Sequence, residues 1–271
     1  MIIPQTRPDR AVIRLAGEAV LGFLNNLLTV NVFAATPVYG ALLSPQGKIL
    51  HDVFVVPDGD VVWIDVAKEQ AAALLQRLIL YRLRGKFEIA HAPHKEVAVS
   101  AAADLMGISY VDPRHAAMGR RAIVDVATLP GGDAAYDKAR LALGLADSAE
   151  DIGTGQLFVH EANLDQLNGV VFNKGCYVGQ EVVARSHHRS SARNRIVPVR
   201  FTGPATKGSA IVSGDTRVGD MLSSYNGQGL ALLRLDRLAE VKVPLLAQAV
   251  RLHVQKPAWM NIEMTVPEVA A

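Results

Sequence analysis

The single cysteine of the chain lies in a short segment whose residue types favour chemistry over packing. Cys176 lies between Gly175 and Gly179 in residues 174–181, a run that begins with a lysine and ends with a glutamine and a glutamate. Glycines permit tight turns and the close approach of a ligand, and a nearby lysine stabilises a thiolate. We therefore predict that residues 174–179, called the thiol loop below, present a reactive thiol on an exposed turn. The alternative is a tight turn in which Cys176 fills a small space in the core.

A second group of polar side chains lies just upstream. His160, Glu161, Asn163 and Asp165 fall within six residues. A carboxylate beside a carboxamide suits a heterocycle that offers paired N–H donors, because carboxylates accept two parallel hydrogen bonds well. Segments rich in Asn and Asp are also typical of loops and helix caps, and the residues alone favour that structural interpretation.

Asp52 is an acid inside an apolar run, residues 48–56, that is otherwise typical of a β-strand. A partly buried carboxylate has a raised pKa and could act as a base or anchor a ligand. Alternatively, Asp52 is a solvent-facing residue of an alternating strand. Residues 112–114 and 119–121 predict a turn with an ion pair, which we interpret as structural.

Residues 182–214 are rich in cations and contain no aspartate or glutamate. Such a stretch could bind phosphates, a poly-anionic tail or an RNA backbone. The alternative is a solvated connection whose cations pair with acids elsewhere. The stretch lacks the interleaved aromatic residues on which single-stranded bases stack. Its adjacent histidines do not define a metal site, and we predict none. The residues concerned are Arg185, His187, His188, Arg189, Arg193, Arg195, Arg200 and Lys207.

The composition of the chain limits the class of protein. Its 271 residues suffice for two domains, and its formal net charge of +2 argues against a dedicated nucleic-acid binder. One cysteine excludes an intramolecular disulfide and a cysteine-only metal site within a single chain. The first residues do not resemble a signal peptide, and no apolar run is long enough to span a membrane. A single cysteine fits a reducing compartment, and we predict a cytoplasmic location.

The spacing of apolar residues predicts an α+β fold. Helical spacing covers residues 18–28, 68–81 and 133–145. Strands of the first part are expected over residues 12–15, 41–43, 48–56, 61–66, 87–90 and 97–101. A strand–helix–strand order among hairpins predicts a layered α+β body with a mixed sheet. From about residue 196, short β-type runs broken by glycine predict a small barrel or sandwich.

Residues 174–181 resemble the signature of the YgfZ family, folate-binding relatives of the glycine-cleavage aminomethyltransferase that are linked to assembly or repair of iron–sulfur clusters. Further stretches resemble family landmarks in family order, so the resemblance covers most of residues 10–235. These stretches are residues 23–27, 42–52, 112–120, 161–165 and 182–185. The resemblance implies a folate-binding body of ferredoxin-like units over residues 1–193. It also implies a C-terminal β-barrel domain and tail over residues 194–271, and a central pocket for tetrahydrofolate.

The resemblance also implies roles for individual residues. Glu161, with Asn163 beside it, corresponds to the position that binds the pterin of tetrahydrofolate. Cys176 corresponds to the functional thiol at the edge of the pocket, and Asp52 to the catalytic acid of the aminomethyltransferases. Further cofactor contacts are predicted from Lys174, Gly175, Tyr177, Gly179, Gln180, Glu181 and Arg185.

The function that the resemblance implies is a tetrahydrofolate-binding protein that assists iron–sulfur cluster assembly or repair through Cys176. One cysteine cannot hold a cluster, which normally takes four protein ligands, so we expect transient cluster contact and a client or scaffold protein as partner. Three alternatives stay open: folate-dependent aminomethyl transfer with Asp52 as acid or base, a regulatory protein linked to tRNA modification, and a cysteine hydrolase. The aminomethyltransferases lack the cysteine segment, and residues 140–144 lack a glutamate that related folate enzymes often carry. Both departures argue against inheriting their reaction.

Overall fold

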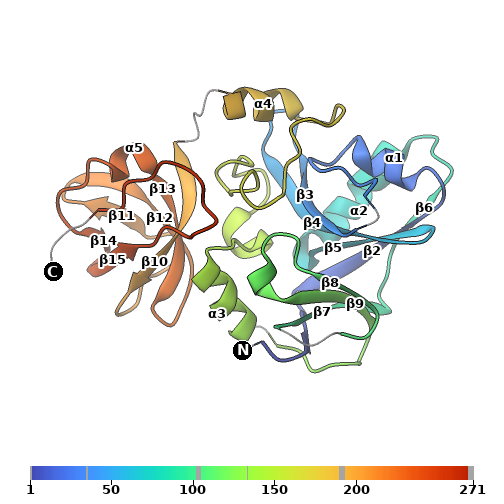
Figure 1. Cartoon of the computed structure of the whole chain (residues 1–271), viewed down its shortest axis with the longest axis horizontal. Helices are drawn as coiled ribbons and strands as arrows, with labels where there is room; N and C mark the ends of the chain where they lie inside the picture. The colour runs from blue at the N-terminus through green and yellow to red at the C-terminus, as the bar shows by residue number, and fades with distance from the viewer. Residues whose placement is uncertain (1, 35, 102–104, 133, 189–192, 268–271) are drawn as a thin grey trace.

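The structure, a computed structural model, describes residues 2–34, 36–101, 105–132, 134–188 and 193–267. It consists of two β-sheets with helices and a closed β-barrel (Figure 1). Below, the barrel is the region from the start of strand β10 onward, and the body is everything before it. This is the α+β architecture with a C-terminal barrel that the sequence predicts. Among the described residues, no helix is both long and apolar enough to cross a membrane.

The first sheet of the body lies between two hydrophobic cores. Its strands have the order β3-β4-β5-β2-β6. Successive residues of a strand point to opposite faces, so Val53 and Val55 enter the core beneath the helices, while Phe54 and Val56 enter the central core. Burial on both faces explains why β4 and β5 are apolar nearly throughout. The strands are β2 Arg10–Ala16, β3 Val38–Leu43, β4 Ile49–Asp58, β5 Val61–Ala67 and β6 Glu88–His91.

Two helices cover one face of this sheet. α2 spans Lys68–Arg82, close to the predicted range, and buries Ala71, Leu74 and Leu78. α1 spans only Val20–Asn25, shorter than predicted. Shortly after the helix, Leu28 forms an isolated bridge with Leu42 of β3.

The second sheet of the body has the strand order β1-β7-β9-β8. Its pairings are antiparallel, and an isolated parallel bridge joins Thr6 to Gly131. The strands are β1 Gln5–Thr6, β7 Lys95–Ser100, β8 Ile108–Val111 and β9 Arg120–Asp125. The associated helices are the 3₁₀ helix η1 Ala116–Met118, α3 Ala134–Leu143 and the π-helix η2 Ser148–Ile152.

The barrel closes in the order β10-β13-β12-β11-β14-β15, with β15 pairing back onto β10. It has a hydrophobic core of its own, and α5 (Leu235–Leu238) contributes Leu238 to that core. The strands are β10 Asn194–Phe201, β11 Ala210–Ser213, β12 Thr216–Tyr225, β13 Gln228–Arg234, β14 Leu245–Ala247 and β15 Val250–Val254.

Several elements carry too weak a pattern for the sequence to predict them. α4 spans Gln180–His188, above the junction of body and barrel in Figure 1, and follows the thiol loop directly. It is mostly polar, so helical spacing of apolar residues is hardly visible. β9 begins with Arg120 and Arg121, which resembled part of a turn. β8 and β14 are only a few residues long.

Candidate functional site

The thiol loop is fixed to the body by the side chain of Lys174. Its Nζ donates to the carbonyl oxygens of Asn25, Leu28 and Val30 at 2.6, 2.7 and 2.8 Å. These carbonyls lie at and after the end of α1, where helical carbonyls lack partners. Partial burial lowers the pKa of Lys174 to about 8, which still leaves the three-donor ammonium as the main form at neutral pH.

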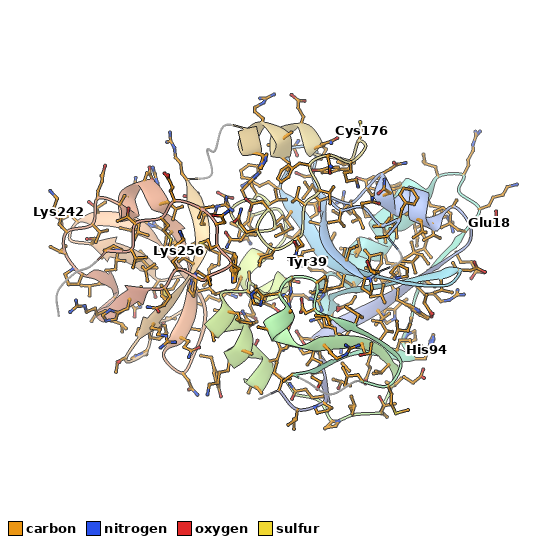
Figure 2. The ribbon with its side chains drawn as sticks, viewed as in Figure 1. Glu18, Tyr39, His94, Cys176, Lys242 and Lys256 are labelled. Atoms are coloured by element: carbon orange, nitrogen blue, oxygen red, sulfur yellow. The ribbon has the colours of Figure 1, made fainter. Side chains whose placement is uncertain are left out.

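Two residues that follow the cysteine are anchored in different cores. Tyr177 is buried in the central core, and Val178 packs against the core beneath α1 and α2. Cys176 lies between these anchors and Lys174, and it is exposed. Figure 2 shows it at the outer edge of the molecule beside α4. The sequence alternative of a cysteine that fills the core is therefore excluded.

The loop also packs against the turn between β3 and β4 through two glycines. Gly179 has a φ of +83°, and a Cβ atom there would lie 2.7 Å from the carbonyl oxygen of Ser44. Gly47, with a φ of +80°, lies opposite, and a Cβ on it would lie 2.9 Å from Val182 Cβ. Both positions therefore require glycine. Gly175 has neither a positive φ nor an atom within 4 Å of an added Cβ.

α4 continues from the loop with one face buried and one face exposed. Val183 packs into the central core, whereas Glu181 and Arg185 form an exposed ion pair with each other. These two predicted cofactor contacts are therefore on the solvent side of α4. Gln180 is half-buried at the start of the helix, where its N–H donates to the carbonyl of Tyr177 at 3.2 Å.

Both carboxylate oxygens of Glu161 already accept hydrogen bonds. Oε2 accepts from the backbone N–H of Phe158 at 2.9 Å, and Oε1 accepts from the carboxamide of Asn194 at 2.9 Å. Lys48 Nζ lies 3.8 Å from Oε2 and 3.5 Å from the ring centroid of Phe158. Glu161 therefore connects the β3–β4 turn to the first residue of the barrel.

Asn163 also makes a contact across the boundary between the body and the barrel. It is buried with a φ of +59°, and its Nδ2 donates to the carbonyl of Ile196 in β10 at 2.8 Å. Nearby, Asp165 accepts two hydrogen bonds from Arg195 at 2.6 and 3.0 Å. These contacts are the ones expected of the structural alternative for residues 161–165, and ligand binding by Glu161 and Asn163 stays a prediction.

Asp52 is buried and has internal partners. Its Oδ2 accepts from the hydroxyls of Tyr39 and Ser148 at 3.0 and 2.9 Å, and Arg10 Nη1 donates to the same Ser148 Oγ at 2.9 Å. Burial raises the pKa of Asp52, and Arg10 opposes that rise. Burial and the Asp52 carboxylate also raise the pKa of Tyr39. The sequence alternative of a solvent-facing Asp52 is wrong.

A fully buried carboxylate beside Asp52 was not predicted from the sequence. Asp65 accepts from Arg10 at 2.6 Å and also from Arg121. Burial alone would raise the pKa of Asp65, but these two guanidinium groups lower it below its ordinary value. Asp65 is the one charged residue of the apolar strand β5, and nothing in the local sequence identifies the two arginines that pair with it.

Further buried polar and charged residues lie around Tyr136. Its Oη accepts from Arg114 at 2.6 Å and from Arg121 at 2.9 Å. Arg114 also pairs with Asp112 at 2.8 Å, which confirms an ion pair in this predicted turn. Arg121 lies 3.9 Å above the ring centroid of Phe54. Below, the central polar cluster means Arg10, Tyr39, Asp52, Asp65, Asp112, Arg114, Arg121, Tyr136 and Ser148.

The β3–β4 hairpin links the three predicted sites without bringing them to one cavity. Its turn touches Gly179, Lys48 reaches Glu161, and Asp52 lies farther along β4 in the central polar cluster. A cavity of about 690 Å³ at the junction of body and barrel is lined by His160, His187, Arg193, Arg195 and eight other residues. Asp52, Glu161 and Cys176 do not line it. Glu161 and Asp52 already accept hydrogen bonds within the chain, so a pterin would have to share these oxygens or replace their present partners, and pterin binding by these residues stays a prediction.

Several cations of residues 182–214 pair with acids from other parts of the chain. Arg195 pairs with Asp165, and Lys207 pairs with Glu150 at 2.6 Å. These pairs support the alternative of a connection neutralised by distant acids. Arg189 lies outside the described residues, as does the side chain of His188. Among the described residues, no group of three or more His, Cys, Asp or Glu side chains could hold a metal ion.

Comparisons with known proteins agree with this architecture. A family model described as the CAF17 C-terminal beta-barrel domain matches residues 193–262. The glycine cleavage system aminomethyltransferase T from Bartonella henselae superposes with a TM-score of 0.76 over 95% of this chain and 86% of that chain, at 14% identity. At that identity the likeness shows the fold alone. The predicted boundary between residues 193 and 194 stays a prediction.

Two relatives resemble the chain over most of its length. The human iron–sulfur cluster assembly factor IBA57, mitochondrial, is 31% identical over 92% of this chain and 83% of its own. The IBA57 homolog of Coccidioides immitis is 28% identical over 87% of this chain and 72% of its own. Both are named as mitochondrial, which contradicts the predicted cytoplasmic location. That prediction was wrong because a single cysteine fits any reducing compartment and does not distinguish among them.

Proposed function

Because the chain belongs to the IBA57 family of iron–sulfur cluster assembly factors, we propose that it takes part in cluster assembly through the thiolate of Cys176. The observation that supports this proposal is an exposed cysteine held between three fixed points, which are Lys174, Tyr177 and Val178. An exposed thiol on a fixed loop can reach a cluster carried by another protein without unfolding its surroundings. Kinship with the YgfZ family stays a prediction.

A partner must supply most of the cluster ligands. Clusters normally take four protein ligands, and this chain contains one cysteine. The partner is therefore a scaffold or client that carries the cluster, and Cys176 contributes one ligand or receives the cluster in transit. The exposed pair of Glu181 and Arg185, five and nine residues after Cys176, offers both signs of charge to the docking surface of that partner.

Tetrahydrofolate binding is the finer part of the proposal, and it has less physical support. A pterin at Glu161 would have to share or replace the hydrogen bonds from Phe158 and Asn194. Such a replacement would loosen the boundary between body and barrel, because Asn194 is the first residue of the barrel. Titration of the protein with tetrahydrofolate, with Glu161→Gln as the comparison, tests this part separately.

The alternatives of aminomethyl transfer and of a regulatory protein linked to tRNA modification also have less support. Aminomethyl transfer would use Asp52 as acid or base, yet Asp52 is 2% exposed and its Oδ2 already accepts two hydrogen bonds. Binding of tRNA would use the basic stretch, of which Arg185, Arg195 and Lys207 are already paired with acids. Turnover of an aminomethyl donor would restore the first alternative, and salt-sensitive tRNA binding would restore the second.

The proposal is tested by complementation in cells that lack the endogenous protein. Cys176→Ala should abolish the rescue of iron–sulfur enzyme activity while leaving the melting temperature unchanged, because the side chain is exposed. Asn173→Ala, an exposed change in the preceding turn, is the matched control and should rescue fully. Full rescue by Cys176→Ala would remove the thiol from the mechanism.

A further inference from the structure

The outer face of the barrel carries an open hollow of about 560 Å³ that the proposed function does not use. Its lining comes from the end of β10, from β15 and from the turn between β12 and β13. The volume lies within the range of small-molecule sites. Cys176 does not line the hollow, and Figure 1 shows β15 in the lower part of the barrel, whereas α4, beside the thiol loop, lies at the top of the molecule.

The alternation of side chains along two barrel strands places the cations of this lining on the outer face. Val199 and Phe201 of β10 pack in the barrel core, so Arg200 between them points outward. The same alternation on β15 places His253 outside, together with Arg251 two residues before it. Arg200 pairs directly opposite His253, and the Cβ atoms of residues in such pairs lie about 4.5–5.5 Å apart. The two side chains can therefore contact one ligand.

The hollow gathers basic side chains without an acidic one. Among the described residues, its lining contains two arginines and a histidine and no aspartate or glutamate. The same is true of two neighbouring hollows that share residues with it, one of which adds Lys256. Arg200 and His253 are exposed, and no hydrogen bond or ion pair joins either side chain to another described residue. Their donor groups are therefore accessible to a ligand, and a bound anion would reduce the repulsion among the basic groups.

The donors of the hollow suit an anion that carries many oxygen atoms. The guanidinium group of Arg200 can donate two parallel hydrogen bonds to a phosphate. Thr202 and Asn226 are exposed residues of the same lining, and they offer a hydroxyl and a carboxamide N–H. A phosphate group has three strong acceptor oxygens and a larger charge than a carboxylate, so it can use more of these donors. Arg200 also belongs to residues 182–214, for which the sequence gives phosphate as one candidate ligand, and unlike Arg195 and Lys207 it pairs with no acid among the described residues.

We propose that this hollow of the barrel is a binding site for a small molecule that carries a phosphate group. Arg200 and His253 hold the phosphate oxygens from β10 and β15. Thr202 and Asn226 donate to the same group from the residue after β10 and from the β12–β13 turn. The site is a binding function of the barrel, and it requires neither the thiol of Cys176 nor a cluster-bearing partner.

The site is tested by titrating the full chain with inorganic diphosphate at constant ionic strength, followed by calorimetry. We expect saturable one-to-one binding with a Kd of about 1 mM or tighter. Malonate, which carries two carboxylates, should bind at least about tenfold more weakly, because it offers fewer oxygens and less charge to the same donors. No saturable binding of diphosphate, or equally tight binding of malonate, would overturn the proposal. A short single-stranded RNA tests a polymeric source of phosphate, and RNA binding at least about tenfold tighter than that of diphosphate would replace the small molecule by a nucleic acid.

Two variants with the same change of net charge locate the binding. Arg200→Gln removes an exposed guanidinium group from the hollow, whereas Lys242→Gln removes one positive charge from an exposed position that does not line it. Figure 2 shows Lys242 at the outer edge of the barrel. Arg200→Gln should weaken diphosphate binding at least about tenfold and Lys242→Gln should not, because only the first removes charge-assisted hydrogen bonds to the ligand. Both variants should keep the melting temperature of the parent chain, since both side chains are exposed. Equal effects of the two variants on binding would show attraction by overall charge alone and would contradict the proposal.

Discussion

The sequence predicts two catalytic residues, Cys176 in the thiol loop and Asp52 in the central polar cluster. Their surroundings in the structure differ. Cys176 is exposed, and the residues around it are fixed by contacts to other parts of the body. Asp52 is buried, and the hydroxyls around it satisfy its carboxylate. Figure 2 shows Cys176 at the rim of the molecule and Tyr39, a partner of Asp52, near its middle.

This difference separates a group that can meet a partner from a group that holds the fold together. A buried charge must be paired, and removing one partner leaves the other uncompensated. An exposed thiol on a fixed loop loses little stability when it is removed. Substitutions in the cluster should therefore change stability first, while substitution of the cysteine should change activity alone.

The largest effect is expected from removing Asp65, which pairs with both Arg10 and Arg121. Asp65→Ala leaves two buried guanidinium groups without this carboxylate, and we expect a loss of about 3–5 kcal/mol in the free energy of unfolding. Denaturant unfolding measures the loss. Asp125→Ala removes the exposed partner of Lys95 and should have a much smaller effect. Equal effects would show that the cluster does not stabilise the body.

Lys174→Met should have the next largest effect, because three backbone carbonyls lose their donor at once. We expect a loss of about 2–3 kcal/mol, with faster alkylation of Cys176 as the loop becomes mobile. Thermal unfolding and the rate of reaction with iodoacetamide measure the two consequences. Lys207→Met, which breaks an exposed pair between the barrel and Glu150 of the body, is the control. An unchanged melting temperature would mean that Lys174 does not anchor the loop.

The two glycines beside the cysteine should respond differently to the same substitution. Gly179→Ala forces an alanine into a positive φ and places its Cβ against the Ser44 carbonyl, so we expect a loss of about 1–2 kcal/mol. Gly175→Ala meets nothing and should be nearly neutral. Comparing the two melting temperatures is a direct check, and a reversed order would contradict the described packing of the loop on the β3–β4 turn.

Asp52 and Asp65 should contribute to the free energy of unfolding with opposite dependences on pH. This effect is smaller than those above. The folded-state pKa of Asp52 is raised, so its stabilising contribution is complete below its ordinary value of 3.8 and is lost as pH rises through the raised value. The folded-state pKa of Asp65 is lowered, so its contribution is present above 3.8 and is lost as pH falls through the lowered value. Asp52→Asn should therefore cost less stability at pH 7 than at pH 3, and Asp65→Asn should cost more at pH 7 than at pH 3. Unfolding free energies at both pH values decide between the signs.

The elements with strong periodicity were predictable from the sequence, and the long-range polar contacts were not. α2 and the strands β2 to β5 follow from the spacing of apolar residues. The exposure of Cys176 followed from its glycine-rich surroundings. The partners of Asp65 and Glu161 could not be predicted, because Arg121 and Asn194 lie 56 and 33 residues away along the chain. Local signals do not determine which distant side chains meet.

The function of the thiol can be measured directly by alkylation of Cys176 in the presence of a cluster-loaded scaffold protein. Mass spectrometry would follow the reaction of iodoacetamide with the single cysteine of the chain, with cluster-free scaffold as the reference. If Cys176 contacts the cluster, the loaded scaffold should slow alkylation at least about tenfold, because a ligated thiolate is not a free nucleophile. Equal alkylation rates with loaded and cluster-free scaffold would contradict the assignment of Cys176 to cluster assembly.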